Sequence, residues 1–161
     1  MHRFFFALLL CILFFLFPFQ IYIIGEEVGI GIQGALYRIQ ASAYGDSLIL
    51  ITNDIGYVTN QTYSGKTALA IIIWVMGTFI FTLTTIFGLG YASESRDDYY
   101  QQISKGILAC CACYLLSDIT QFGIMFSGSA GIAMPFGILL IIFWTLVLNR
   151  YPNLLSSFIY S

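Results

Sequence analysis

Charged side chains are scarce in this sequence. Lys, Arg, Asp and Glu make up 9% of its 161 residues, whereas an ordinary soluble domain has roughly 25%. Apolar residues make up 59% of the chain, and a soluble domain of this size cannot remove that much apolar surface from water. The shortage of charge therefore predicts an integral membrane protein, with the lipid bilayer as its first partner.

Basic residues and histidine are also few. Six Lys and Arg face eight Asp and Glu, and His2 is the single histidine. This balance excludes a nucleic-acid partner, which would need a basic surface. One terminal histidine supplies neither a metal site nor a catalytic triad, and no phosphate-binding glycine loop is present. We therefore expect no catalytic residues, no metal and no cofactor.

Four apolar segments are each candidates to cross a bilayer. They cover residues 4–24, 67–91, 103–126 and 132–148. The first is expected to be a retained span bent by Pro18 rather than a signal peptide, because its apolar run is too long and no cleavage site follows. The predicted fold is an all-α transmembrane four-helix bundle that forms a single membrane domain over residues 1–161.

The loop at 25–66 has the composition of a soluble protein. Apolar residues alternate with period two at 28–32, and glycines there argue against a helix. Turn residues separate further strand candidates at 36–43, 48–52 and 55–63. We expect a small antiparallel sheet outside the membrane, between the first and second spans. The loop has no cysteine, so it is not a disulfide-stapled ectodomain.

The distribution of basic residues orients this topology. Four spans place both termini on one side, and the positive-inside rule makes the side with more Lys and Arg cytoplasmic. The terminal side would carry Arg3, Arg96, Lys105 and Arg150, and the loop side Arg38 and Lys66. The termini are therefore expected to be cytoplasmic, and the loop at 25–66 to face outward. There the Asn60-Gln61-Thr62 sequence is a glycosylation sequon at Asn60.

Asp118 is the only acid inside an apolar segment. A carboxylate in a span costs about 2.5–3.5 kcal/mol on insertion scales, so it must be protonated, partnered or hydrated. No Lys, Arg or His lies in a span to pair with it, and the expected partners are Ser117, Gln121, Thr84 and Thr85. The alternatives are a structural hydrogen bond between helices, a proton or cation site, and a pair with a basic residue of another subunit.

Cys110 and Cys113 form a C-x-x-C sequence inside the third span. Four-span quinone-linked disulfide oxidoreductases use this spacing, and the similarity implies a redox pair. The alternative is close helix packing, because Gly106, Cys110, Cys113 and Ser117 form a stripe of small residues on one helix face. All four cysteines, which include Cys11 and Cys111, lie in apolar segments.

The order of four spans, a first outer loop with β character and a short second hairpin resembles claudin-like tetraspan proteins. The loop lacks the tryptophan motif and the cysteine pair of that family. We expect a non-enzymatic membrane protein that acts by association, as an accessory subunit of a membrane complex or as a claudin-like contact module. The alternatives are a transport unit that uses Asp118, as a homo-oligomer, and a thiol oxidoreductase that uses Cys110 and Cys113.

Overall fold

The computed structural model describes residues 2–25, 29–43, 45–93 and 98–150. In chain order these residues form α1 (His2–Leu16), β1 (Pro18–Ile24), β2 (Gly29–Gly34), β3 (Tyr37–Ser42), β4 (Gly45–Leu50), α2 (Ile51–Thr59), α3 (Gly65–Ser93), α4 (Asp98–Phe122), β5 (Ser127–Gly128), β6 (Gly131–Met134) and α5 (Phe136–Arg150). The strands make one antiparallel sheet with the order β4-β3-β2-β1-β6-β5. The molecule is a mixed α/β fold, and the predicted all-α four-helix bundle is wrong.

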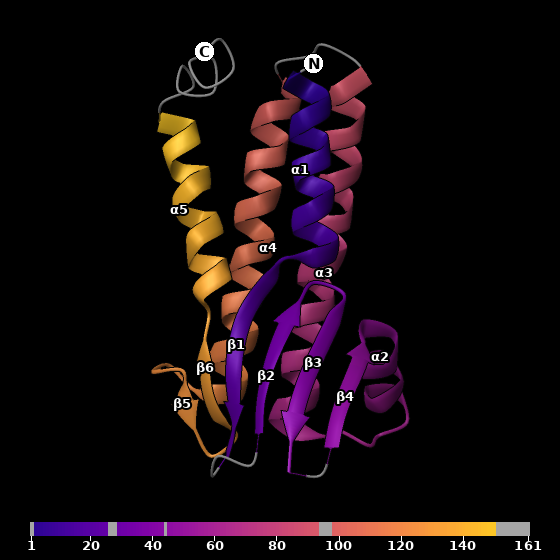
Figure 1. Cartoon of the computed structure of the whole chain (residues 1–161), viewed down its shortest axis with the longest axis vertical. Helices are drawn as coiled ribbons and strands as arrows, with labels where there is room; N and C mark the ends of the chain where they lie inside the picture. Colours follow the sequence, from indigo (N-terminus) through magenta and orange to yellow (C-terminus); the bar gives the residue numbers. More distant parts are fainter. Residues whose placement is uncertain (1, 26–28, 44, 94–97, 151–161) are drawn as a thin grey trace.

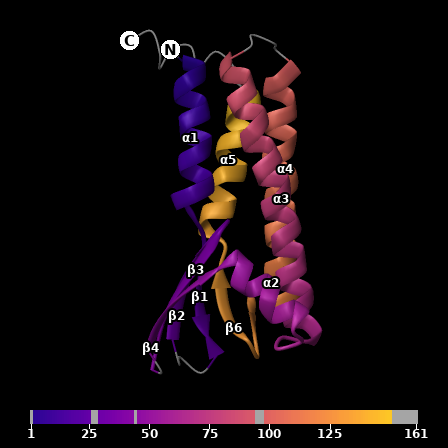
Figure 2. The same cartoon turned by 90° about the vertical axis from the view of Figure 1, so that its right-hand side faces the viewer.

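Two long helices, α3 and α4, run side by side along the molecule (Figure 1). α1 and α5 lie beside one end of this pair, the helical end, and the sheet lies beside the other end, the sheet end. Figure 2 shows α1 and the sheet on the same side of the two long helices. α1 starts and α5 finishes at the end that is opposite the sheet, so the sheet is built from segments that follow α1 and precede α5.

The first predicted span is the largest error in the sequence analysis. The helix ends at Leu16, and residues from Pro18 onward form β1 between β2 and β6. Proline disfavours a helical conformation in the residue before it and cannot donate a backbone hydrogen bond. The aromatic and β-branched residues that follow then favour a strand. One continuous apolar run therefore contains a helix and a strand.

The fourth predicted span and the outer loop also need correction. Residues 132–134, assigned to that span, belong to β6, and α5 starts at Phe136 after Pro135. The loop contributes β2, β3 and β4, but 55–63 is not a strand, because α2 covers Ile51–Thr59. Among the described residues, two helices, Gly65–Gly90 and Gln101–Phe122, are long and apolar enough to cross a membrane.

The two faces of the sheet differ in polarity. The outer sheet face, which points away from α3 and α4, exposes Ile21, Ile30, Ile39, Leu48, Leu50, Ile132 and Met134. The inner sheet face carries the polar side chains of Gln20, Tyr22, Gln33, Arg38 and Gln40, together with Ile24, Ile49 and Ala133. Soluble proteins usually pack the apolar face of a sheet inward, so the polarity of this sheet is inverted.

Aromatic rings fill the junction between the sheet and the helices. Phe19 of β1 is fully buried, and its ring lies 4.9 Å from that of Tyr114 and 5.7 Å from that of Phe81. The rings of Trp74 and Tyr114 are 4.2 Å apart. This cluster joins β1, α3 and α4, and it holds the polar inner sheet face against the long helices.

Candidate functional site

Asp118 of α4 lies at the centre of a buried polar layer between the inner sheet face and the long helices. Its exposed fraction is 1%, and that of Gln20, which faces it from β1, is 3%. With its amide nitrogen turned to Asp118, Gln20 donates to both carboxyl oxygens, at 2.5 Å and 2.9 Å. The acid of the third predicted span therefore contacts the first predicted span through an amide.

The Gln20 amide links Asp118 to Gln33 of β2. In this orientation the amide oxygen of Gln20 accepts from the side-chain amide of Gln33 at 2.8 Å. The row from Asp118 through Gln20 to Gln33 is therefore one chain of hydrogen bonds that joins α4, β1 and β2.

The hydroxyl groups expected to surround Asp118 bond to helix carbonyls instead. Thr84 and Thr85 donate within their own helix, and Ser117 donates across to α3. The three bonds are Thr84 Oγ1 to the Ile80 carbonyl at 2.8 Å, Thr85 Oγ1 to the Phe81 carbonyl at 2.9 Å, and Ser117 Oγ to the Ala70 carbonyl at 2.7 Å. Backbone bonding of this kind is usual for hydroxyls inside helices.

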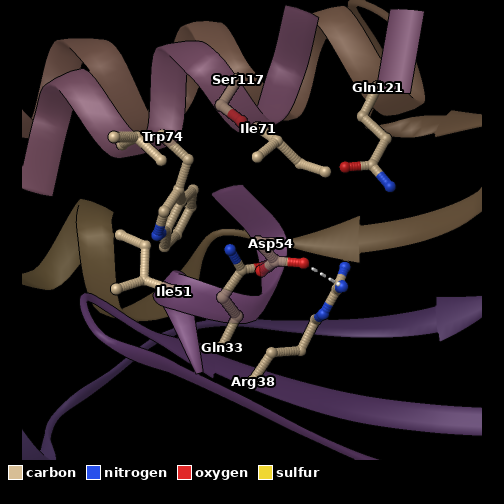
Figure 3. A pocket seen from close by; sticks show the side chains of 9 residues that line it. Gln33, Arg38, Ile51, Asp54, Ile71, Trp74, Ser117 and Gln121 are labelled. Carbon is tan, nitrogen blue, oxygen red and sulfur yellow. Dashed lines mark hydrogen bonds and ion pairs between the residues drawn. The ribbon is translucent and has the colours of Figure 1, made fainter. Parts of the chain in front are cut away.

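A small cavity adjoins this layer, and Gln121 lines it together with Ser117 (Figure 3). Its volume is about 10 Å³, which is near the least space that one water molecule needs. Arg38 of β3 and Asp54 of α2 form an ion pair at its edge, with 2.7 Å between the guanidinium and the carboxylate. This cavity can hold a water molecule but no larger ligand.

Burial affects the acid and phenol groups at this edge of the layer. It raises the pKa of Asp54, and the nearby Arg38 guanidinium offsets part of that rise. Burial also raises the pKa of Tyr22 to about 12, again with an opposing contribution from Arg38. The Tyr22 ring covers Gly31 on the neighbouring strand, where any side chain would overlap the ring. Both groups hold their protons more firmly than they would in water.

The small residues of α4 lie against α3. A side chain at Gly106 would overlap Thr84, and Cys113 lies beside Gly77. Cys110 is buried with an exposed fraction of 1%, and its thiol donates to the Ile107 carbonyl at 3.0 Å. All four cysteines are free thiols. This arrangement accounts for the small residues through helix packing.

Asn60 lies directly after α2, at the sheet end of the molecule, and is exposed. The sequon is therefore sterically accessible. Within the described ranges, no group of three His, Cys, Asp or Glu residues could hold a metal ion.

Gln20 and Gln33 are site residues that the sequence analysis missed. Gln20 is the one side-chain amide in the apolar run at 4–24, and this was the available signal, since a polar side chain in such a run needs a buried partner. Searches of protein-family models, curated proteins and solved structures find no match for this chain.

Proposed function

We propose that this chain is a non-enzymatic integral membrane protein that acts by association with other membrane proteins. In this proposal α3 and α4 cross the bilayer, and α1 and α5 pack beside them. The observation that carries it is the inverted polarity of the molecule. Amides and an acid are buried, while large apolar side chains cover the outside of both the helices and the sheet.

The exposed face of α3 supports the proposal that lipid surrounds the long helices. Large apolar side chains recur every three or four residues along its exposed face, at Leu69, Ile72, Met76, Phe79, Leu83 and Ile86. Only 44% of each candidate span is buried, whereas the core helix of a soluble protein is mostly buried. Water is a poor solvent for such a continuous stripe, and lipid tails are a good one.

The ends of the molecule differ in basic residues, which supports one orientation. Arg3 lies in α1, Lys105 in α4 and Arg150 in α5, each in the part of its helix at the helical end (Figure 1), whereas Arg38 in β3 and Lys66 in α3 lie at the sheet end. Arg96, which was counted with the first group, lies outside the described residues. By the positive-inside rule the helical end is cytoplasmic and the sheet end is outside. Attachment of a glycan at Asn60 in a eukaryotic host would test this orientation directly.

Two measurements test the proposal. Membranes that contain the protein are washed with alkaline carbonate, and the protein should stay in the pellet. Extraction in mild detergent followed by native mass measurement should then find the chain with further polypeptides, which include copies of itself. Release by carbonate would refute membrane integration, and a monodisperse monomer without companions would refute association.

The isolation of Asp118 favours a second candidate function, a proton-linked transport unit. Its carboxyl group is buried with a neutral amide as its side-chain partner. Proton flux into liposomes should then occur with the parent protein and fall at least tenfold in Asp118→Asn. Equal flux in both proteins, or no flux in the parent, would remove this candidate.

A further inference from the structure

We infer that the outer sheet face binds the same face of a second copy of this chain, an inference that rests on the proposed function. The face is formed by the outward residues of β1, β2, β3, β4 and β6, which are mostly large and apolar; Ala41 of β3 and Asp46 of β4 lie on it beside Ile30. Ile30 of β2 is 53% exposed and Ile39 of β3 is 43% exposed. These strands lie next to each other in the sheet, so the exposed apolar surface is continuous.

α1 extends this surface toward the helical end. It lies on the same side of the long helices as the sheet (Figure 2). Its side chains that point away from α3 are apolar and exposed, and they are Leu8, Leu9, Ile12, Phe15 and Leu16. The hydroxyl of Tyr37 on β3 donates to the Leu16 carbonyl at 2.8 Å, which fixes the end of α1 above the sheet.

The size of the surface suits a dimer. Five strands about 4.8 Å apart and about 20 Å long present roughly 480 Å². The stripe of α1 from Leu8 to Leu16, about 14 Å long and about 10 Å wide, adds roughly 140 Å². The combined area of roughly 620 Å² reaches the roughly 600 Å² that each partner contributes at the lower end of stable interfaces.

Lipid is a poor occupant for the sheet part of this surface. β4 and β5 are the edges of the sheet, and an edge strand carries backbone N–H and C=O groups that no neighbouring strand satisfies. Hydrocarbon around the sheet would also surround these edges, at a cost of several kcal/mol for each unsatisfied group.

A second copy matches the face in shape and in membrane orientation. A two-fold axis along the length of the molecule keeps both copies in the same direction across the bilayer, and it brings identical surfaces together. Two twisted sheets then pack face to face at about 30°, about 10 Å apart, with their apolar side chains interdigitated. The outer sheet faces become the two halves of one apolar core.

The test uses the full chain in lipid nanodiscs or mild detergent, with mass measured by light scattering. The parent should be a dimer, and the double variant Ile30→Thr with Ile39→Thr should be a monomer. Threonine keeps the preference for a strand while it makes the face polar. The control is Ile86→Thr, a change of the same kind on the exposed stripe of α3, which should remain a dimer.

Cross-linking in native membranes gives an independent readout that does not depend on the stability of the double variant. Ile30→Cys, treated with a short bifunctional thiol reagent, should form a dimer several times more efficiently than Phe79→Cys. A parent monomer, a double variant that stays dimeric, or equal cross-linking at both positions would overturn the inference. If the carbonate wash retains the protein and other polypeptides co-purify with it, the proposed function survives that failure.

Discussion

Replacement of Gly106 by alanine tests how tightly α4 packs on α3. The added methyl group would overlap Oγ1 of Thr84 and lie 3.1 Å from its Cβ and Cγ2 atoms. The Thr84 side chain cannot turn away easily, because its hydroxyl donates to the Ile80 carbonyl at 2.8 Å and its β-branched rotamers are restricted. The two helices must therefore separate slightly to accept the methyl group.

The expected change in the free energy of unfolding combines two effects. Overpacking destabilises by about 1–3 kcal/mol, and the higher helix propensity of alanine offsets about 1 kcal/mol of this. Gly106→Ala should therefore destabilise the protein by about 1 kcal/mol. In a Thr84→Ala background the overlap is absent, so the same change should stabilise by up to about 1 kcal/mol, and the coupling should be about 2 kcal/mol.

Equilibrium unfolding in mixed micelles, with the four proteins of this double-mutant cycle, measures the coupling. Gly90→Ala is the control on the same helix pair, because among the described residues no atom beyond its own turn of helix lies within 4 Å of the added methyl group. It should be neutral or slightly stabilising. If Gly106→Ala matches this control, or if the coupling with Thr84→Ala is below about 0.5 kcal/mol, the packing argument fails.

Three further predictions concern the polar layer. Asp118→Ala should lower the free energy of unfolding by about 1–3 kcal/mol, because it removes the acceptor of the buried Gln20 amide nitrogen, and Asp118→Asn should cost less in the same unfolding assay. Asp54→Ala should cost about 3–5 kcal/mol of unfolding free energy at neutral pH, because it leaves the Arg38 charge buried without its partner. The folded-state pKa of Asp54 is raised above 3.8, so the stability that comes from its protonated form is fully present below pH 3.8 and is lost as the pH rises through the raised pKa. Asp54→Asn should remove this pH dependence of the unfolding free energy. The pKa of Tyr22, raised from 10.0 to about 12, predicts stability that is present below pH 10.0 and lost through about pH 12, and the phenolate absorbance of the parent compared with Tyr22→Phe checks it.

The sequence predicted the long helices better than it predicted the sheet. Helix α3 covers the whole segment expected at 67–91, because its backbone hydrogen bonds join residues four apart and depend on local sequence. The strand after Pro18 could not be recognised from hydropathy, since a buried strand and a buried helix segment are both apolar runs. Its partners decide its conformation, and β6 lies more than 100 residues away in the chain.

The same distinction applies to the candidate site. The sequence identified Asp118 as a buried acid without a cation nearby, since charge in an apolar segment is visible in composition alone. It did not identify Gln20 as the partner, because that contact forms only after β1 leaves the helical path and turns its amide toward α4. The hydroxyl groups that the sequence predicted as its partners, on Thr84, Thr85 and Ser117, donate to helix carbonyls instead.

The amino-acid sequence by itself determined that two long apolar helices form and that an acid is buried among them. Only the tertiary structure decided that six strands from two distant segments join into one sheet, which face of that sheet is apolar, and which amide meets Asp118. The physical reason is that helical hydrogen bonds are local, whereas strand pairing and buried polar contacts are made between residues far apart in the chain.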